Sequence, residues 1–173
     1  MKNHRDYVRE ALDKFMIDKK PGKVLEIGSG PIEQSFKSYF EEKGWTWLGQ
    51  DSASFIGVSY LSKMEDLNNI LTDSYDLVFS CHSFEHCERP VDALREFNRV
   101  LKPEGNLFMA TPNPCKHHIL DADADHIFVL HPMQMVRLVY YCGFDDGTSS
   151  FQKEGIELEQ NYNVITIANK RKI

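Results

Sequence analysis

The sequence predicts an α/β fold in which a doubly wound, mostly parallel sheet ends in an antiparallel hairpin. Short apolar runs, which are typical of buried strands, alternate with segments whose apolar residues recur at helical spacing. This alternation favours a parallel sheet covered by helices on both faces. Near the end, residues 162–168 alternate apolar and polar residues, as a half-buried strand does. We place the hairpin at about residues 144–168.

The first half of the chain supplies an N-terminal helix, one strand–helix unit and two further strands. An N-terminal helix over about residues 5–19 places its apolar residues on one face, and Pro21-Gly22 ends it. The apolar run 23–27 predicts a buried strand. An amphipathic helix then begins near Ile32 and ends at Gly44, because Phe36, Tyr39 and Phe40 keep helical spacing. Residues 45–49 and 58–61 predict two further strands.

The second half repeats the pattern. The nearly continuous apolar run 75–80 predicts a strand, and Pro90 suits the first turn of a helix that continues to Leu101. Pro103 and Gly105 end that helix. Residues 106–111 form the next expected strand, and a helix over 133–141 ends at Gly143. Ligands of such sheets bind beyond the carboxyl ends of the strands. The segments of functional interest are therefore 28–31, 50–52, 62–66, 80–87 and 111–126.

Composition limits the class of protein. A chain of 173 residues with 42% hydrophobic residues suits a single domain over 1–173. The net charge of −6 disfavours a nucleic-acid partner. We expect no membrane segment, and the N-terminal residues lack the apolar core of a signal peptide, so a cytoplasmic location is expected. The four cysteines form no CxxC pair and are expected to be free thiols.

The motif VLEIGSG at residues 24–30 ends an apolar strand in a glycine turn. Gly28 and Gly30 allow a sharp bend and the close approach of a ligand to the backbone. Glu33 stands where a dinucleotide-binding turn has its third glycine, and no Gly-Lys-Ser/Thr sequence follows, so the turn does not suit a pyrophosphate. Asp51, at the end of the second strand, can accept hydrogen bonds from both hydroxyls of a ribose. Taken alone, the turn also fits a structural bend, and Asp51 also fits a helix cap.

Four stretches together resemble one family: VLEIGSG, WLGQDSAS, SYDLVFSCHSFEHCERPVDALREFNRVLKPEGNLFMATPN and DADHIFVLHPMQMVRLVYYCGF. They are similar to the class I S-adenosylmethionine-dependent methyltransferases, and most similar to the small-molecule groups called type 11 and type 23. The resemblance covers roughly residues 20–145. It implies a Rossmann-like, seven-stranded sheet, and S-adenosylmethionine as the cofactor with S-adenosylhomocysteine as its product.

The resemblance also implies roles for residues. The turn and Glu26 would frame the methionine part of the cofactor, Asp51 would hold the ribose, and Met64 would contact the adenine. Where the family often has an acid for the adenine amino group, this chain has Lys63, which cannot accept that hydrogen bond. The predicted cofactor-binding residues are Glu26, Gly28, Ser29, Gly30, Asp51, Ser52, Met64, Ser80 and His82.

A histidine is the expected base for a hydroxyl or ammonium acceptor. His86 follows the fourth strand, and His126 lies in the segment expected to cover the substrate, so these two are the predicted catalytic residues. The alternative is that His86 orients its loop and His126 packs under a lid. HSFEH does not match the HExxH zinc motif, and DADAD does not continue as a calcium loop. No metal site is predicted, although a divalent ion held by His and Asp stays an open alternative.

The predicted function is methyl transfer from S-adenosylmethionine to oxygen or nitrogen of a small polar molecule, by a monomer or homodimer. One alternative is a non-catalytic cofactor-binding accessory protein, which Lys63 and the short helix after Asp51 motivate. Another is modification of a protein or a nucleic acid, and for a nucleic acid Cys115 would be a candidate nucleophile. The acidic composition disfavours a nucleic-acid target.

Overall fold

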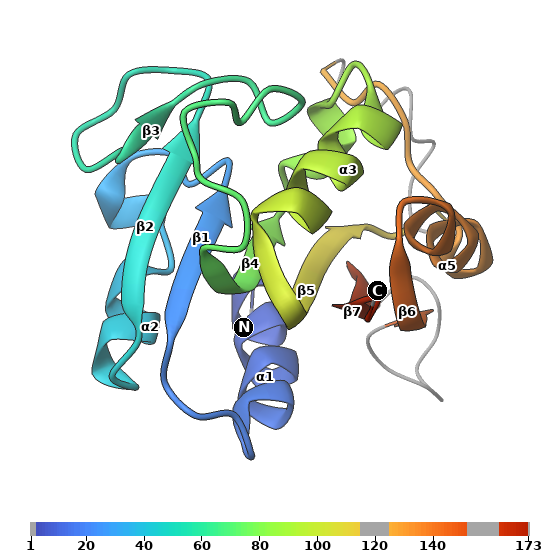
Figure 1. The fold of residues 1–173 in the computed structure, drawn as a ribbon, viewed down its shortest axis with the longest axis horizontal. Helices are drawn as coiled ribbons and strands as arrows, with labels where there is room; N and C mark the ends of the chain where they lie inside the picture. The colour runs from blue at the N-terminus through green and yellow to red at the C-terminus, as the bar shows by residue number, and fades with distance from the viewer. Residues whose placement is uncertain (1–2, 115–124, 152–162, 173) are drawn as a thin grey trace.

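A seven-stranded sheet forms the centre of the computed structural model, which describes residues 3–114, 125–151 and 163–172 (Figure 1). The strand order is β3-β2-β1-β4-β5-β7-β6. The strands are β1 (Lys23–Ile27), β2 (Thr46–Asp51), β3 (Tyr60–Leu61), β4 (Tyr75–Cys81), β5 (Leu101–Pro112), β6 (Phe144–Phe151) and β7 (Asn163–Lys170). The helices are α1 (His4–Met16), α2 (Lys37–Glu42), α3 (Pro90–Val100) and α5 (Pro132–Tyr141), with short 3-10 helices η1 (Ile32–Gln34) and η2 (Phe84–His86).

The sheet confirms the predicted fold class. The pairs β3–β2, β2–β1, β1–β4 and β4–β5 are parallel, whereas β7 pairs antiparallel with both β5 and β6. The C-terminal hairpin therefore adds to the sheet with β7 inserted between β5 and β6. The chain reverses its winding at β1, from which β2 lies on one side and β4 on the other, so the ends of these strands border a site where ligands bind in such sheets.

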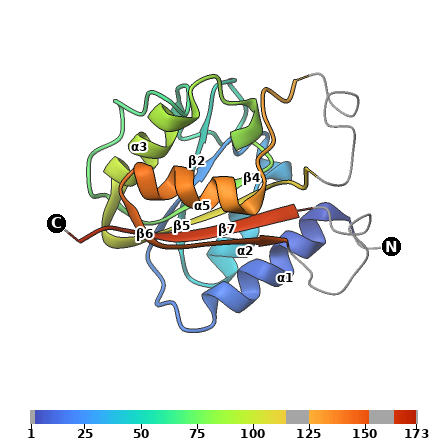
Figure 2. The same cartoon turned by 90° about the vertical axis from the view of Figure 1, so that its right-hand side faces the viewer.

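Helices cover the sheet on both faces: α3 and α5 lie on one side, and α1 and α2 on the other (Figure 2). Side chains that follow one another along β1 point to opposite faces of the sheet, so they pack into two separate parts of the core. Val24 packs with the α1 and α2 side, and Leu25 and Ile27 pack with the α3 and α5 side. Successive residues of β1 thus serve two separate apolar layers, which explains why the run is nearly continuously apolar.

Two predicted helices differ from the structure. The N-terminal helix ends at Met16 rather than near residue 19, because Met16 is its last buried residue and Ile17 is 75% exposed. The helix expected from Ile32 is interrupted. Ser35 is extended, and Phe36 donates its backbone N–H to the Glu26 carboxylate, so the α-helix begins only at Lys37.

Two further expectations concern membranes and cysteines. Among the described residues, every helix is too short or too polar to cross a bilayer. Cys81, Cys87 and Cys142 are free, as predicted, and all three are buried, whereas Cys115 lies outside the described residues.

Candidate functional site

A cleft of about 410 Å³ lies at the carboxyl ends of β1, β2 and β4. Its size falls in the range of small-molecule sites. The walls come from the four segments that follow β1, β2, β3 and β4, four of the five expected from sequence. The lining residues are Gly28, Gln50, Asp51, Ser52, Lys63, Met64, Glu65, His82, Ser83, His86, Cys87 and Glu88.

The turn after β1 is shaped by a neighbouring strand end. Gly28 has a φ of +64°, and a Cβ there would lie 2.3 Å from the Cβ of Ser83. Ser83 donates its hydroxyl to the carbonyl of Ile27 and contacts the hydroxyl of Ser80 at 2.7 Å. The close approach predicted at Gly28 is therefore made by Ser83, although Gly28 also lines the cleft. Ser80 is fully buried beneath this contact.

Asp51 points back at the same turn. Its Oδ2 accepts from the N–H of Gly30 at 2.9 Å, and its Oδ1 accepts from the N–H of Ala53 at 2.9 Å. Each carboxylate oxygen has a second lone pair, so Asp51 keeps acceptor capacity toward the cleft that it lines. The carboxylate thus joins the turns after β1 and β2. Ser52 lines the cleft beside it and is exposed.

Glu26 faces the protein and is not among the residues that line the cleft. It is 3% exposed and accepts hydrogen bonds from Phe36 N–H at 2.9 Å and from Trp47 Nε1 at 2.7 Å. Burial raises the pKa of Glu26 to about 7, and the two donors act against that shift. The acid of VLEIGSG therefore ties β1 to β2 and to the start of α2. Ser29 is likewise buried, and its N–H donates to the carbonyl of Gln50.

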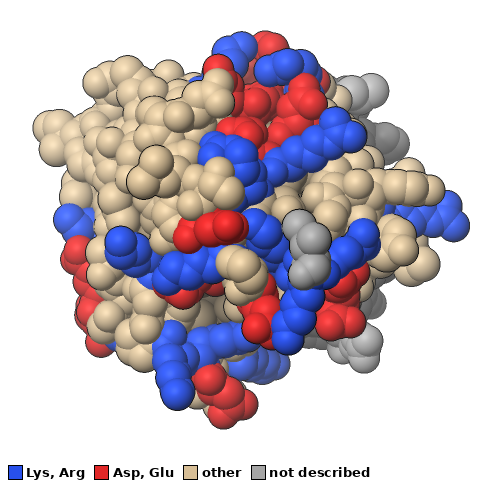
Figure 3. Space-filling view, viewed as in Figure 1, with Lys and Arg blue, Asp and Glu red and all other residues tan. Residues whose placement is uncertain are grey.

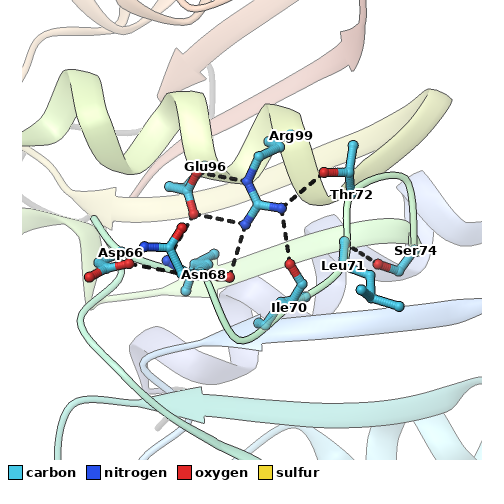
Figure 4. Close-up of polar contacts among 9 residues, drawn as sticks. Asp66, Asn68, Ile70, Leu71, Thr72, Ser74, Glu96 and Arg99 are labelled. Carbon is cyan, nitrogen blue, oxygen red and sulfur yellow. Dashed lines mark hydrogen bonds and ion pairs between the residues drawn. The ribbon is translucent and has the colours of Figure 1, made fainter.

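The loop after β3 is anchored by Arg99 of α3 (Figure 4). The Arg99 guanidinium donates to the carbonyls of Leu67 and Ile70, each at 2.9 Å, and forms an ion pair with Glu96. Glu96 in turn accepts from the N–H of Leu67 at 2.8 Å. This network fixes the chain just after Lys63 and Met64, which line the cleft.

His82 lies at the end of β4 with a left-handed φ of +51°. Its Nε2 is 2.6 Å from Asn163 Oδ1, and its ring packs 4.7 Å from the ring of His4. Since Asn163 uses its Nδ2 to donate to the carbonyl of His4, its Oδ1 is the acceptor and His82 carries its proton on Nε2. Burial lowers the pKa of His82 to about 4, so it is a neutral side chain near neutral pH.

His86 and His126, the predicted catalytic pair, lie next to each other although they are 40 positions apart in the chain. Their ring centroids are 5.0 Å apart. Glu85 lies with them: its Oε1 is 3.9 Å from His126 Nε2 and 3.6 Å from His82 Nδ1, and its side chain is 1% exposed. His86 lines the cleft and is exposed, and the side chain of His126 is 14% exposed.

The predicted site residues therefore divide into three groups. Gly28, Asp51, Ser52, Met64, His82 and His86 line the cleft. Glu26, Ser29 and Ser80 are buried and Gly30 is half-buried, all outside the cleft lining, and His126 contacts His86. Of three other histidines, His131 caps α5, whereas His117 and His118 lie outside the described residues.

Sequence reasoning missed Ser83 and Gln50. The signal for Ser83 is the glycine at position 28, because the Ser83 side chain occupies the space that a Cβ at position 28 would need. Gln50 follows from its place at the end of β2, beside Asp51. No sequence signal separates Glu85 from a surface acid, because its burial depends on the segment 125–128 that packs over it.

The sequence matches a known family. Residues 25–109 match the family model described as a methyltransferase domain. That range runs from β1 to β5 and includes every residue that lines the cleft. No curated protein matches the sequence.

Solved structures share the fold over nearly the whole chain. A SAM-dependent methyltransferase from Archaeoglobus fulgidus is 21% identical, with a TM-score of 0.76, and the match covers 97% of this chain and 95% of that one. A methyltransferase in complex with the Haloferax volcanii Trm112 methyltransferase activator is 16% identical, with a TM-score of 0.74, and the match covers 96% of this chain and 90% of that one. A Haemonchus contortus phosphoethanolamine N-methyltransferase, with phosphomonomethylethanolamine and S-adenosylhomocysteine bound, is 15% identical, with a TM-score of 0.72. The match covers 98% of this chain and 53% of that one.

Proposed function

We propose that this chain, a class I S-adenosylmethionine-dependent methyltransferase of the type 11 group, transfers the methyl group to an oxygen or nitrogen of a small polar molecule. The observation that carries this proposal is the composition of the cleft. Asp51 lines the cleft with acceptor capacity to spare, and His86, which lies beside His126, lines it as well. A site for the cofactor thus adjoins two imidazoles that can serve an acceptor.

The residues present fit the cofactor. Asp51 would accept hydrogen bonds from the ribose hydroxyls, and Met64 would pack on the adenine. Gly28 and His82 would border the methionine part. S-adenosylmethionine supplies a methyl group on a sulfonium: as the acceptor atom forms its bond to the methyl carbon, the S–C bond breaks and its electron pair stays on sulfur.

The role proposed for His86 and His126 is to position the acceptor and to take its proton. A hydroxyl or an ammonium acceptor must lose one proton for each methyl group that it gains, and an imidazole nitrogen can accept it. His82 is less suited to this task. Its Nε2–H is committed to Asn163, and burial lowers its pKa to about 4. We therefore assign His82 to shaping the cleft.

A small acceptor suits the surface. Figure 3 shows Lys and Arg side chains interspersed with Asp and Glu on the face that it displays, without one continuous basic area. With the net charge of −6, this favours a small molecule over a nucleic acid. The free thiols of Cys81, Cys87 and Cys142 fit the reducing cytoplasm, where we propose that the enzyme acts.

The test is calorimetry with S-adenosylhomocysteine. We expect about micromolar binding (roughly −8 kcal/mol) to the wild type. Asp51→Ala should lose most of it, because it removes both the ribose acceptor and the partner of the Gly30 N–H. Asp18→Ala is the matched control and should bind as the wild type does, since Asp18 is an exposed aspartate outside the cleft lining. Unchanged affinity in Asp51→Ala would remove Asp51 from the binding site.

Turnover identifies the acceptor class. The wild type, incubated with methyl-labelled S-adenosylmethionine, should label hydroxyl or amine compounds from a metabolite extract. Label found only in protein or nucleic acid would overturn the small-molecule assignment.

A further inference from the structure

We propose that Glu85, His86 and His126 together bind a divalent transition-metal ion of the Zn²⁺ type at the edge of the cleft. One ligand atom from each of the three side chains lies within 4.8 Å of the other two. In a tetrahedral zinc site the ligand atoms are about 3.4 Å apart, given metal–ligand distances of about 2.0–2.2 Å. Small rotations of the side chains therefore bring the three atoms to ligand distance.

The backbone holds these residues in place. Ile127 donates its N–H to the carbonyl of Glu85 at 2.9 Å, which fixes the segment that carries His126 against η2. The ring of Phe128 packs on the ring of Phe84 at 5.3 Å, edge to face. Because Phe84 and Phe128 flank the three ligands in sequence, the cluster is supported by an apolar contact as well as by a hydrogen bond. Such support is what a preorganised metal site needs.

The protonation state of His86 suits metal binding. Its Nδ1 is 3.0 Å from the carbonyl oxygen of Asp125, which can only accept a hydrogen bond, so Nδ1 carries the proton. Nε2 of the neutral ring is then the nitrogen with a lone pair. Metal-binding histidines commonly donate their other ring N–H to a carbonyl or carboxylate in this way.

The charge and exposure of the cluster also suit a cation. Glu85 is 1% exposed, and the ring nitrogens given above near its Oε1 belong to histidines, His82 at 3.6 Å and His126 at 3.9 Å. A buried carboxylate is stabilised when it is paired with positive charge or coordinates a metal. Two imidazoles and one carboxylate form a ligand set typical of catalytic zinc sites, which keep a fourth position open. Here that position would face the cleft, because His86 is exposed and lines it.

The inference rests on the proposed function for its consequence in catalysis, and it changes the task of the two histidines from proton acceptors to ligands. A bound divalent ion lowers the pKa of a coordinated hydroxyl group. The acceptor would then lose its proton to solvent before methyl transfer. The favoured acceptor is accordingly one with a hydroxyl or phenol oxygen that can reach the ion.

The first experiment measures metal binding without any turnover. The full chain is stripped with a chelator and titrated with Zn²⁺ by calorimetry, and with Co²⁺ by visible absorption, which reports tetrahedral coordination. We expect one ion per chain. His86→Ala, His126→Ala and Glu85→Gln should each weaken binding by at least about tenfold, because each removes or neutralises a ligand. Should Glu85→Gln fail to fold, the exposed position of His86 keeps His86→Ala as a folded test.

Matched controls separate this site from other histidines. His131→Asn removes an imidazole but keeps a side chain that can cap α5, so metal binding should not change. His117→Ala/His118→Ala removes two histidines outside the proposed ligand set and should also bind as the wild type does. No Zn²⁺ binding by the wild type, unchanged binding in His86→Ala and His126→Ala, or binding lost only in a control would overturn the proposal. A site that binds Mg²⁺ but not Zn²⁺ would overturn the assigned metal class.

Calorimetry with S-adenosylhomocysteine distinguishes the two proposals. If the chain binds the nucleoside but no metal, the proposed function stands and the metal site fails. If it binds Zn²⁺ through these three residues but no nucleoside, the metal site stands and the proposed function fails.

Discussion

The two halves of the cleft are constructed by different means. In the cofactor half, formed by Gly28, residues 50–52 and Met64, positions are set mainly by strand ends and backbone N–H groups, as in the Gly30–Asp51 hydrogen bond. In the histidine half, formed by His82, Glu85, His86 and His126, positions are set by side chains from two segments 40 residues apart. The difference teaches that binding of the nucleoside depends on the sheet, whereas acceptor chemistry depends on how residues 125–128 pack on η2.

The largest expected contrast between the halves is kinetic. His86→Ala and His126→Ala should each lower turnover by about 10²–10⁴-fold, the usual range for losing a group that handles the acceptor's proton. Both variants should bind S-adenosylhomocysteine nearly as the wild type does, because neither residue contacts Asp51 or its turn in the bonds described. Asp51→Ala should show the opposite pattern, with affinity lost. If both histidine variants turn over normally, the catalytic assignment is wrong.

The next prediction concerns the stability of the turn in the cofactor half. Gly28→Ala should lower the free energy of unfolding by about 3–4 kcal/mol, from left-handed strain plus overpacking against Ser83. Gly30→Ala has nearly the same φ of +63° but open space, so it should cost only about 1–2 kcal/mol. Urea unfolding measures both. Adding Ser83→Gly to Gly28→Ala should recover the overpacking part, and equal costs at both glycines would contradict the interpretation.

A third prediction uses two buried titratable groups, Glu26 in β1, outside the cleft lining, and His82 in the histidine half. Burial raises the pKa of Glu26 to about 7 from 4.5, so the folded state binds the proton more tightly and stability falls as pH rises from about 4.5 to 7. Burial lowers the pKa of His82 to about 4 from 6.5, so the unfolded state binds the proton more tightly and stability rises from about pH 4 to 6.5. Each change is about 3 kcal/mol, and the two oppose each other between about pH 4.5 and 6.5.

Single variants separate these opposed contributions. Glu26→Gln keeps an oxygen acceptor for Phe36 and Trp47, and its stability should rise with pH from about 4 to 6.5. His82→Asn keeps a residue that tolerates the left-handed φ of +51°, and its stability should fall over about pH 4.5 to 7. Urea unfolding at four pH values tests both. Parallel curves for the two variants would show that these groups do not titrate as described.

The smallest expected effect concerns the adenine end of the cofactor half. Lys63→Glu should raise the affinity for S-adenosylhomocysteine by about two- to fivefold, the range of one added hydrogen bond to the adenine amino group. Losing the exposed contact of Lys63 with Glu88 at 3.4 Å should cost little. Lys63→Met removes the charge without adding an acceptor and serves as the control. If Lys63→Met gains as much affinity for S-adenosylhomocysteine as Lys63→Glu does, the effect comes from removing the positive charge and not from an added hydrogen bond.

The fold followed closely from periodicity because the central strands β1 and β4 are nearly continuous buried runs. The sequence could not show that α2 starts late: Ile32, Phe36 and Tyr39 keep helical spacing, but the Glu26 carboxylate takes the Phe36 N–H that a continuous helix would use. A local pattern does not reveal such a competitor from a distant strand.

The cofactor half of the site was predictable for a related reason. Residues at the ends of neighbouring parallel strands must meet, so the glycine turn and Asp51 are brought together by topology. Glu85 was not recognised as part of a cluster, because its burial depends on residues 125–128, and no periodicity relates those to η2. Placements of side chains that depend on tertiary packing between loops were the part that the sequence did not reveal.

Gly28 and Ser83 pack so closely that the size of the side chain at one position limits the size at the other, although they are 55 positions apart in the chain. While position 83 carries a side chain as large as serine, position 28 has no room for even one methyl group. Across homologous chains, bulk gained at one of these positions should accompany bulk lost at the other. An engineer who reshapes the loop after β4 must therefore design the two positions as a pair.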